Sequence, residues 1–122
     1  MPSPWLALAA TLLAALGAGH SYLGERHFLP RLFARGPTAP HFAADGFSRR
    51  TLRFVWHLAS VGWWGAAALC GVLGRGDAAG GLRVVAATVL ASGVVTAAGS
   101  RGRHPAWALC VVIAAAAWRG AS

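Results

Sequence analysis

Long apolar segments constrain the fold of this chain more than any other feature. A helix needs about 20 apolar residues to cross the hydrocarbon core of a bilayer, and only helices or closed barrels satisfy their backbone polar groups there. The pattern predicts an all-α integral membrane four-helix bundle, in a single transmembrane domain over residues 1–122. The last segment is short, so we expect flanking residues at both of its ends to help it span the bilayer. The four predicted spans cover residues 4–24, 51–73, 82–99 and 105–119.

The composition supports a membrane protein and argues against a nucleic-acid partner. Of the 122 residues, 57% are hydrophobic and 11% are charged, whereas a soluble domain carries about 25% charged residues. The net charge is +8, and all 11 basic residues are arginines. They lie between apolar segments rather than along one soluble face, which the positive-inside rule explains without nucleic acid. We therefore expect the lipid bilayer as the main partner.

The arginines are distributed unequally between the two ends of the predicted bundle. Cytoplasmic connections of membrane proteins are enriched in lysine and arginine. The distribution therefore predicts the bacterial inner (plasma) membrane, with both termini on the non-cytoplasmic side. A cleaved signal peptide is the alternative for the first segment, but no basic residue precedes it. The first and third connections hold eight arginines (Arg26, Arg31, Arg35, Arg49, Arg50, Arg53, Arg101 and Arg103), and the other end holds three (Arg75, Arg83 and Arg119).

Residues 25–50 form the longest polar stretch, and three prolines interrupt it. Pro30, Pro37 and Pro40 are incompatible with one continuous helix over this stretch. We therefore predict a Pro/Arg-rich interfacial loop, whose first part lies against lipid headgroups with its arginine heads in water. Asp45 is a candidate cap or turn residue before the next helix.

Small and hydroxyl-bearing residues recur every four positions within the predicted spans. This spacing places them on one helix face, where they permit close helix packing. We expect these faces to meet in the centre of the bundle, and the hydroxyls to bond carbonyls one turn back. Lining of a substrate path is the alternative for the hydroxyl stripe. The residues concerned are Thr88, Ser92, Thr96 and Ser100, then Gly62, Ala66 and Cys70, and finally Ala10, Ala14 and Ala18.

Histidines from three predicted helices fall at a similar depth, near the arginine-rich end. They are His20, His57 and His104, and the only glutamate, Glu25, lies nearby. Ionisable residues at this depth are rare and usually functional. On a continuing α-helix, Glu25 is turned about 140° away from the face of His20. We predict a cluster of these four residues, supported by Arg53, Arg101, Ser21 and Trp56.

Several kinds of chemistry are compatible with this cluster. A structural network would fix the register of the helices, with Glu25 paired to an arginine. A metal site would use His20, His57, His104 and Glu25 as ligands of zinc, iron or copper. A b-type haem would take His20 and His57 as axial ligands between facing helices. Proton-coupled transport would use Glu25 as the titrating group, although transporter sites usually lie near the midplane.

Two short stretches of the chain resemble a known group of proteins. HSYLGE at residues 20–25 and LRFVWH at 52–57, in a four-span layout, are similar to small uncharacterised bacterial inner-membrane proteins. The resemblance covers most of the chain, implies no particular activity, and directs attention to these two stretches. Our leading hypothesis is a structural or accessory membrane protein, in a homo-oligomer or a larger membrane complex. The sequence favours a non-enzymatic role without deciding the question, and a haem- or metal-binding redox protein is the alternative.

Overall fold

The computed structural model describes residues 3–38 and 40–121, except for the side chain of Phe42, and the described part is helical throughout its regular elements. The predicted all-α architecture is confirmed, with four main apolar helices in the described residues. In chain order the elements are α1 (Pro4–Leu23), the π-helix η1 (Gly24–Phe28), α2 (Leu29–Phe33), the 3-10 helices η2 (Gly36–Thr38) and η3 (His41–Ala43), α3 (Gly46–Leu73), α4 (Ala78–Ser100) and α5 (Ala106–Gly120).

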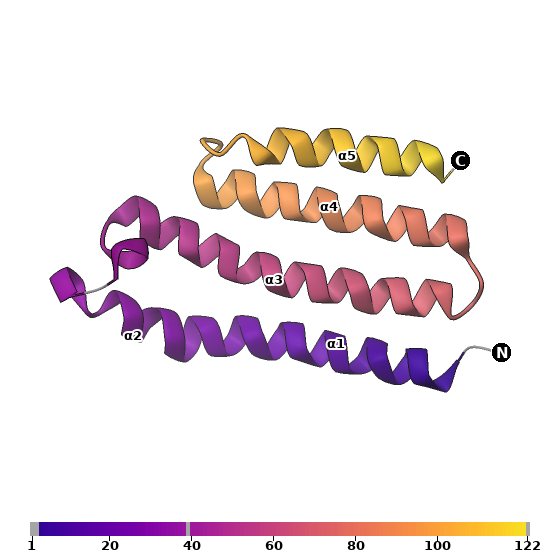
Figure 1. Cartoon of the computed structure of the whole chain (residues 1–122), viewed down its shortest axis with the longest axis horizontal. Helices are drawn as coiled ribbons and strands as arrows, with labels where there is room; N and C mark the ends of the chain where they lie inside the picture. Colours follow the sequence, from indigo (N-terminus) through magenta and orange to yellow (C-terminus); the bar gives the residue numbers. More distant parts are fainter. Residues whose placement is uncertain (1–2, 39, 122) are drawn as a thin grey trace.

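The long helices lie side by side in one layer, in the order α1, α3, α4, α5 (Figure 1). Each long helix packs mainly against its neighbours in this order, so the layer has no common centre in which all four helices meet. The expectation that the small faces meet in such a centre is therefore wrong. On α1, for example, Ala14 and Ala18 are exposed. Both ends of the chain lie at one end of the layer, and the segment between α1 and α3 lies at the other.

Within residues 3–38 and 40–121, three helical segments are long and apolar enough to cross a membrane: the continuous run Pro4–Phe33, then α3 and α4. The fourth predicted span, α5, has only 15 residues. At a rise of about 1.5 Å per residue it is roughly 22 Å long, which is short of a hydrocarbon core of about 30 Å. Large apolar side chains are exposed along all four long helices, as a lipid-facing surface requires, among them Leu12, Leu16, Val55, Leu90, Val94 and Val112.

A π-helical turn carries the first helix past the predicted start of the loop. In η1 the Leu29 N–H donates to the carbonyl of Gly24, five residues back. A proline lacks an N–H and its ring clashes with the carbonyl four residues earlier. The wider turn immediately before Pro30 gives the proline ring more room beside the preceding carbonyls, and helical structure continues to Phe33. The loop predicted over residues 25–50 is confined to residues 34–45, because α3 also begins earlier than expected.

Acidic caps and a left-handed turn set the ends of α3 and α4. Asp45 Oδ1 accepts the Ser48 N–H over 2.8 Å at the start of α3, as predicted for a cap. Asp77 accepts the Gly80 N–H over 2.7 Å at the start of α4. Arg101 and Gly102 adopt positive φ angles of 53° and 74°, which stop α4 and begin the turn to α5.

Glycines allow the helices to approach closely at each interface. Gly17 lies beneath the indole of Trp64 and Gly24 beneath that of Trp56, between α1 and α3. Each indole also donates its Nε1–H to a carbonyl of α1, over 3.2 Å to Ala14 and 3.0 Å to His20. In the same way Gly99 lies against Phe54 between α3 and α4, and Gly93 lies against Cys110 between α4 and α5. A side chain from the neighbouring helix thus replaces each missing β-carbon.

The hydroxyl stripe of α4 bonds within its own helix. Thr88, Ser92, Thr96 and Ser100 each donate to the carbonyl four residues back, over 2.6–2.9 Å. The structure thus agrees with the expected local bonding. Each of these hydroxyl protons is donated within α4, so the stripe contributes to helix packing mainly through the small size of its side chains.

Candidate functional site

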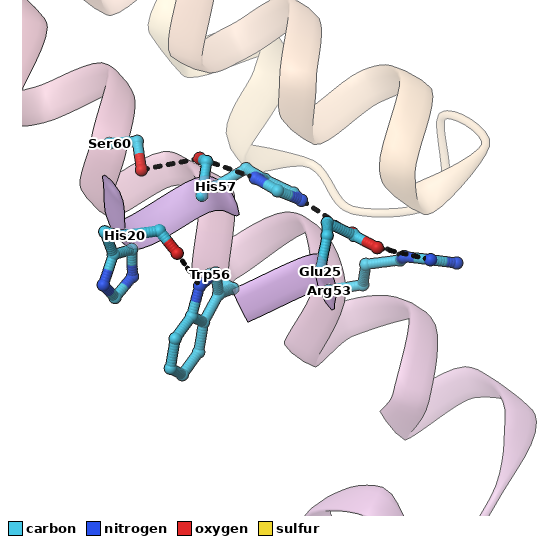
Figure 2. A network of polar contacts seen from close by, with 7 residues as sticks. His20, Glu25, Arg53, Trp56, His57 and Ser60 are labelled. Carbon is cyan, nitrogen blue, oxygen red and sulfur yellow. Dashed lines mark hydrogen bonds and ion pairs between the residues drawn. The ribbon is translucent and has the colours of Figure 1, made fainter. Parts of the chain in front are cut away.

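Five polar side chains form one connected network between α1–η1 and α3 (Figure 2). Arg53 Nε donates to Glu25 Oε1 over 2.7 Å, and Arg53 Nη2 donates to Glu25 Oε2 over 2.6 Å. Glu25 Oε1 also lies 2.8 Å from His57 Nε2. On the other side of the ring, His57 Nδ1 lies 2.9 Å from Ser21 Oγ, which lies 2.7 Å from Ser60 Oγ. We call this set, Arg53–Glu25–His57–Ser21–Ser60, the polar network.

Helical spacing on both sides explains how the network assembles. Arg53, His57 and Ser60 are separated by four and three residues, so they share one face of α3. Ser21 and Glu25 are four residues apart and face α3 from the first helix. The antiparallel packing of α1 on α3 then places these two faces opposite each other. The π-turn begins at Gly24, so Glu25 occupies its first turn.

The network runs from the surface into the interior. The side chain of Arg53 is 58% exposed, those of Glu25 and His57 are 34% and 30% exposed, and Ser60 is fully buried. The arginine and carboxylate form a bidentate pair, which is the strongest geometry for such an ion pair. The exposed end of the network is therefore charged, and its buried end consists of neutral hydroxyls.

The network is satisfied in two proton arrangements. If His57 is neutral with its proton on Nε2, it donates to Glu25 and accepts the Ser21 hydroxyl at Nδ1, while Ser21 accepts from Ser60. If His57 is charged, both ring nitrogens donate, and Ser21 donates to Ser60 instead. Hydroxyls rotate to suit either pattern. The observed heavy-atom distances fit both hydrogen-bond patterns.

His20 belongs to a separate aromatic cluster rather than to the polar network. Its ring stacks on Trp56 with centroids 4.3 Å apart and planes 7° apart, and it meets Trp63 edge-on at 4.9 Å. Phe28 also stacks on Trp56, at 4.7 Å. In Figure 2 the His20 ring points away from His57. Since Trp56 and His57 are consecutive on α3, their side chains leave the helix about 100° apart and contact different sides of the first helix.

His104 lies beyond the end of α4, outside both clusters. Its N–H donates to Ser100 Oγ over 3.3 Å, and its Nδ1 accepts from the Ala106 N–H over 3.3 Å. Its ring meets Phe54 edge-on at 6.5 Å. Arg101, expected to support the cluster, instead forms the left-handed end of α4, and Glu25 pairs with Arg53.

The predicted ligand set of His20, His57, His104 and Glu25 does not come together. Among the described residues, no three histidine, cysteine, aspartate or glutamate side chains are grouped so that they could hold a metal ion. The reason is that His20 and His57 lie on different sides of the α1–α3 interface and His104 is in a turn. The haem hypothesis requires His57 as an axial ligand, but both of its nitrogens already have partners. Ligation would therefore break part of the polar network.

The prediction identified four of the five network residues: Ser21, Glu25, Arg53 and His57. It missed Ser60, as well as the role of Phe28 and Trp63 in the aromatic cluster. Ser60 follows His57 by three residues and could have been found from its place on the same face as Arg53 and His57. Phe28 could not, because its contact with Trp56 depends on the π-turn.

The order hydroxyl, imidazole, carboxylate also occurs in sites that activate a serine nucleophile. Acyl transfer further needs donors aimed at a developing oxyanion. Ser21 lies in the last turn of α1, where the nearby Gly24 N–H already bonds to the carbonyls of His20 and Ser21. The backbone N–H groups there are engaged in helical hydrogen bonds, so the arrangement favours ion pairing and proton transfer over acyl transfer.

No protein-family model, curated protein or solved structure matches this chain. The resemblance carried by HSYLGE and LRFVWH therefore stays a prediction.

Proposed function

We propose that this protein is a small polytopic membrane protein with a structural or accessory role, in which the polar network clamps α1 to α3. The observation that carries the proposal is the completeness of the network. Both carboxylate oxygens of Glu25 and both ring nitrogens of His57 have partners within the same chain. A network that satisfies its own members specifies one helix register and leaves few groups for a substrate.

The proposed setting is a bacterial inner membrane, with both termini on the non-cytoplasmic side. The arginine bias supports this orientation. The charged pair of the network, Glu25 and Arg53, flanks the arginine-rich connection between α1 and α3 in the sequence. The open layer also supports an accessory role. Both edge helices, α1 and α5, pack mainly against a single neighbour, so a second copy or a larger complex can cover the remaining apolar faces.

The clamp can be tested by thermal unfolding of the protein in detergent. Arg53→Gln removes the bidentate ion pair and is expected to lower the melting temperature by about 2–5 °C, since an exposed pair stabilises only modestly. Arg26→Gln is the matched control, because it removes a neighbouring exposed arginine on η1. Equal melting temperatures for Arg53→Gln and the wild type would overturn the clamp.

A second candidate function is proton conduction through the network. It is favoured by the unbroken hydrogen-bonded chain from exposed Arg53 and Glu25 to buried Ser60, with an imidazole in the middle. Histidine relays protons readily near neutral pH. In proteoliposomes under a membrane potential, the wild type would then acidify or alkalinise the lumen, and Ser21→Ala would abolish the flux. Flux equal to that of empty liposomes would exclude this candidate.

A further inference from the structure

A cavity of about 650 Å³ lies beside the first helical run, on the side of the aromatic cluster. Its walls come mainly from the last turn of α1, from η1 and from α2, and Arg35, Pro40 and Trp56 complete the lining. It lies on the opposite side of the α1–α3 interface from the polar network. Glu25, Arg53 and His57 of that network line a separate pocket. The residues that matter for its chemistry are His20, His27, Phe28, Arg31, Arg35 and Trp56.

The helical continuation past Pro30 creates this cavity. His20, His27, Arg31 and Arg35 follow one another at intervals of seven, four and four residues, and all four line the same cavity. An unstructured loop over these residues would not have aligned them. The cavity extends from His20 past Leu23, the last residue of α1, where the apolar segment gives way to arginines. In a bilayer this depth corresponds to the level of the lipid headgroups.

The charge and shape of the cavity fit an anionic amphiphile. Arg31 and Arg35 are exposed and supply guanidinium groups at the rim. No acidic side chain is among the described residues that line the cavity. Phe28 and Trp56 form an apolar aromatic wall next to them. The nearby carboxylate of Glu25 is already paired with Arg53 on the other side of the interface, so it does not compete for these arginines.

We propose that this cavity binds an anionic phospholipid through the phosphate of its headgroup. Arg31 and Arg35 hold the phosphate oxygens, as guanidinium groups do with bidentate geometry. An acyl chain of the lipid lies against Phe28 and Trp56. Basic pockets between membrane helices recognise headgroups by this combination of charge and apolar contact.

The test is a lipid titration of the full chain in neutral detergent, with bound lipid measured by native mass spectrometry. The wild type is expected to retain phosphatidylglycerol in preference to phosphatidylcholine. Arg31→Gln combined with Arg35→Gln should weaken phosphatidylglycerol binding about 30-fold, since each arginine near a membrane surface contributes about 1 kcal/mol. The matched control is Arg26→Gln combined with Arg103→Gln, which removes the same charge from exposed arginines that do not line the cavity.

Three results would overturn the proposal. The first is a wild type without preference for phosphatidylglycerol, and the second is an equal loss of binding in the control variant. The third is displacement of the lipid by inorganic phosphate alone, which would show a site for free phosphate rather than for a lipid. A further test uses only the wild type, so it does not depend on whether a variant folds. The preference for phosphatidylglycerol should fall as the salt concentration is raised. A preference that does not change with salt would also contradict the proposal.

Discussion

Trp56 lies directly over Gly24, with its Nε1–H donated to the carbonyl of His20 over 3.0 Å. A β-carbon at position 24 would overlap the indole, so the two helices reach this distance only because residue 24 is glycine. The contact also sets the orientation of α3 against the first helix. With Trp56 held on the His20 side, the next residue, His57, faces Glu25 and Ser21.

Gly24→Ala is therefore expected to destabilise the protein by about 1–3 kcal/mol, because the added methyl displaces the indole. Gly19→Ala is the matched control, since a β-carbon at position 19 meets no atom within 4 Å. Alanine has the higher helix propensity, so the control should be neutral or more stable by up to about 1 kcal/mol. Thermal or denaturant unfolding in detergent measures both variants. Equal stabilities for the two would show that Trp56 does not occupy the space above Gly24.

Ser21→Ala is expected to lower the free energy of unfolding by about 1 kcal/mol, because it removes the hydroxyl that bonds both His57 Nδ1 and Ser60. Ser92→Ala serves as the control, since that hydroxyl bonds only a carbonyl of its own helix among the contacts described. Its loss should cost much less. If unfolding measurements gave the control the larger loss, the hydroxyl of Ser21 would have no role in joining the helices.

The cap of α3 predicts a pH dependence. Hydrogen bonds from the Ser48 N–H and hydroxyl to the ionised carboxylate hold the pKa of Asp45 below its ordinary value of 3.8. A group with a lowered folded pKa stabilises fully above its unfolded pKa, and the stabilisation is lost as the pH falls through the folded value. The Ser48 amide resonance in NMR should therefore titrate below pH 3.8, and Asp45→Asn should remove this titration while keeping the cap. A midpoint at or above the ordinary value would contradict the cap.

The alternative of a haem protein has a simple spectroscopic consequence. Since both ring nitrogens of His57 are engaged within the chain, the purified protein is expected to show no Soret band. Supplementation of the growth medium with iron and a haem precursor should not change this. A Soret band that disappears in His57→Ala would establish haem ligation and remove the structural proposal.

The fold was largely predictable from the sequence, because segment length and hydropathy alone determine where membrane-length helices form. The error at residues 25–50 came from Pro30, since proline usually ends a helix and nothing in the sequence marks a π-turn. The site was only partly predictable for the same reason. The residue spacing on α3 indicated that Arg53 and His57 share a face. The direction of the Glu25 side chain was calculated for an unbroken α-helix, which the π-turn replaces.

The failure of the predicted histidine group has a geometric cause. Similar depth in a membrane places side chains at one level but not on one side of a helix interface. His20 and His57 have similar depth, yet one stacks on Trp56 and the other bonds to Glu25. The side that each histidine occupies depends on how α3 is rotated about its axis. The contacts between glycine and tryptophan determine this rotation, and the residue spacing in the sequence did not reveal them.

The clamp between α1 and α3 is tested most directly by a double-mutant cycle on Glu25 and His57. Glu25→Ala and His57→Phe each remove one side of the contact, and the double variant removes both. Unfolding free energies in detergent should reveal a coupling of about 1 kcal/mol between the two positions, as expected for a hydrogen bond to a charged group that is partly exposed. Additive effects, within about 0.3 kcal/mol, would mean that Glu25 and His57 do not interact and would contradict the clamp.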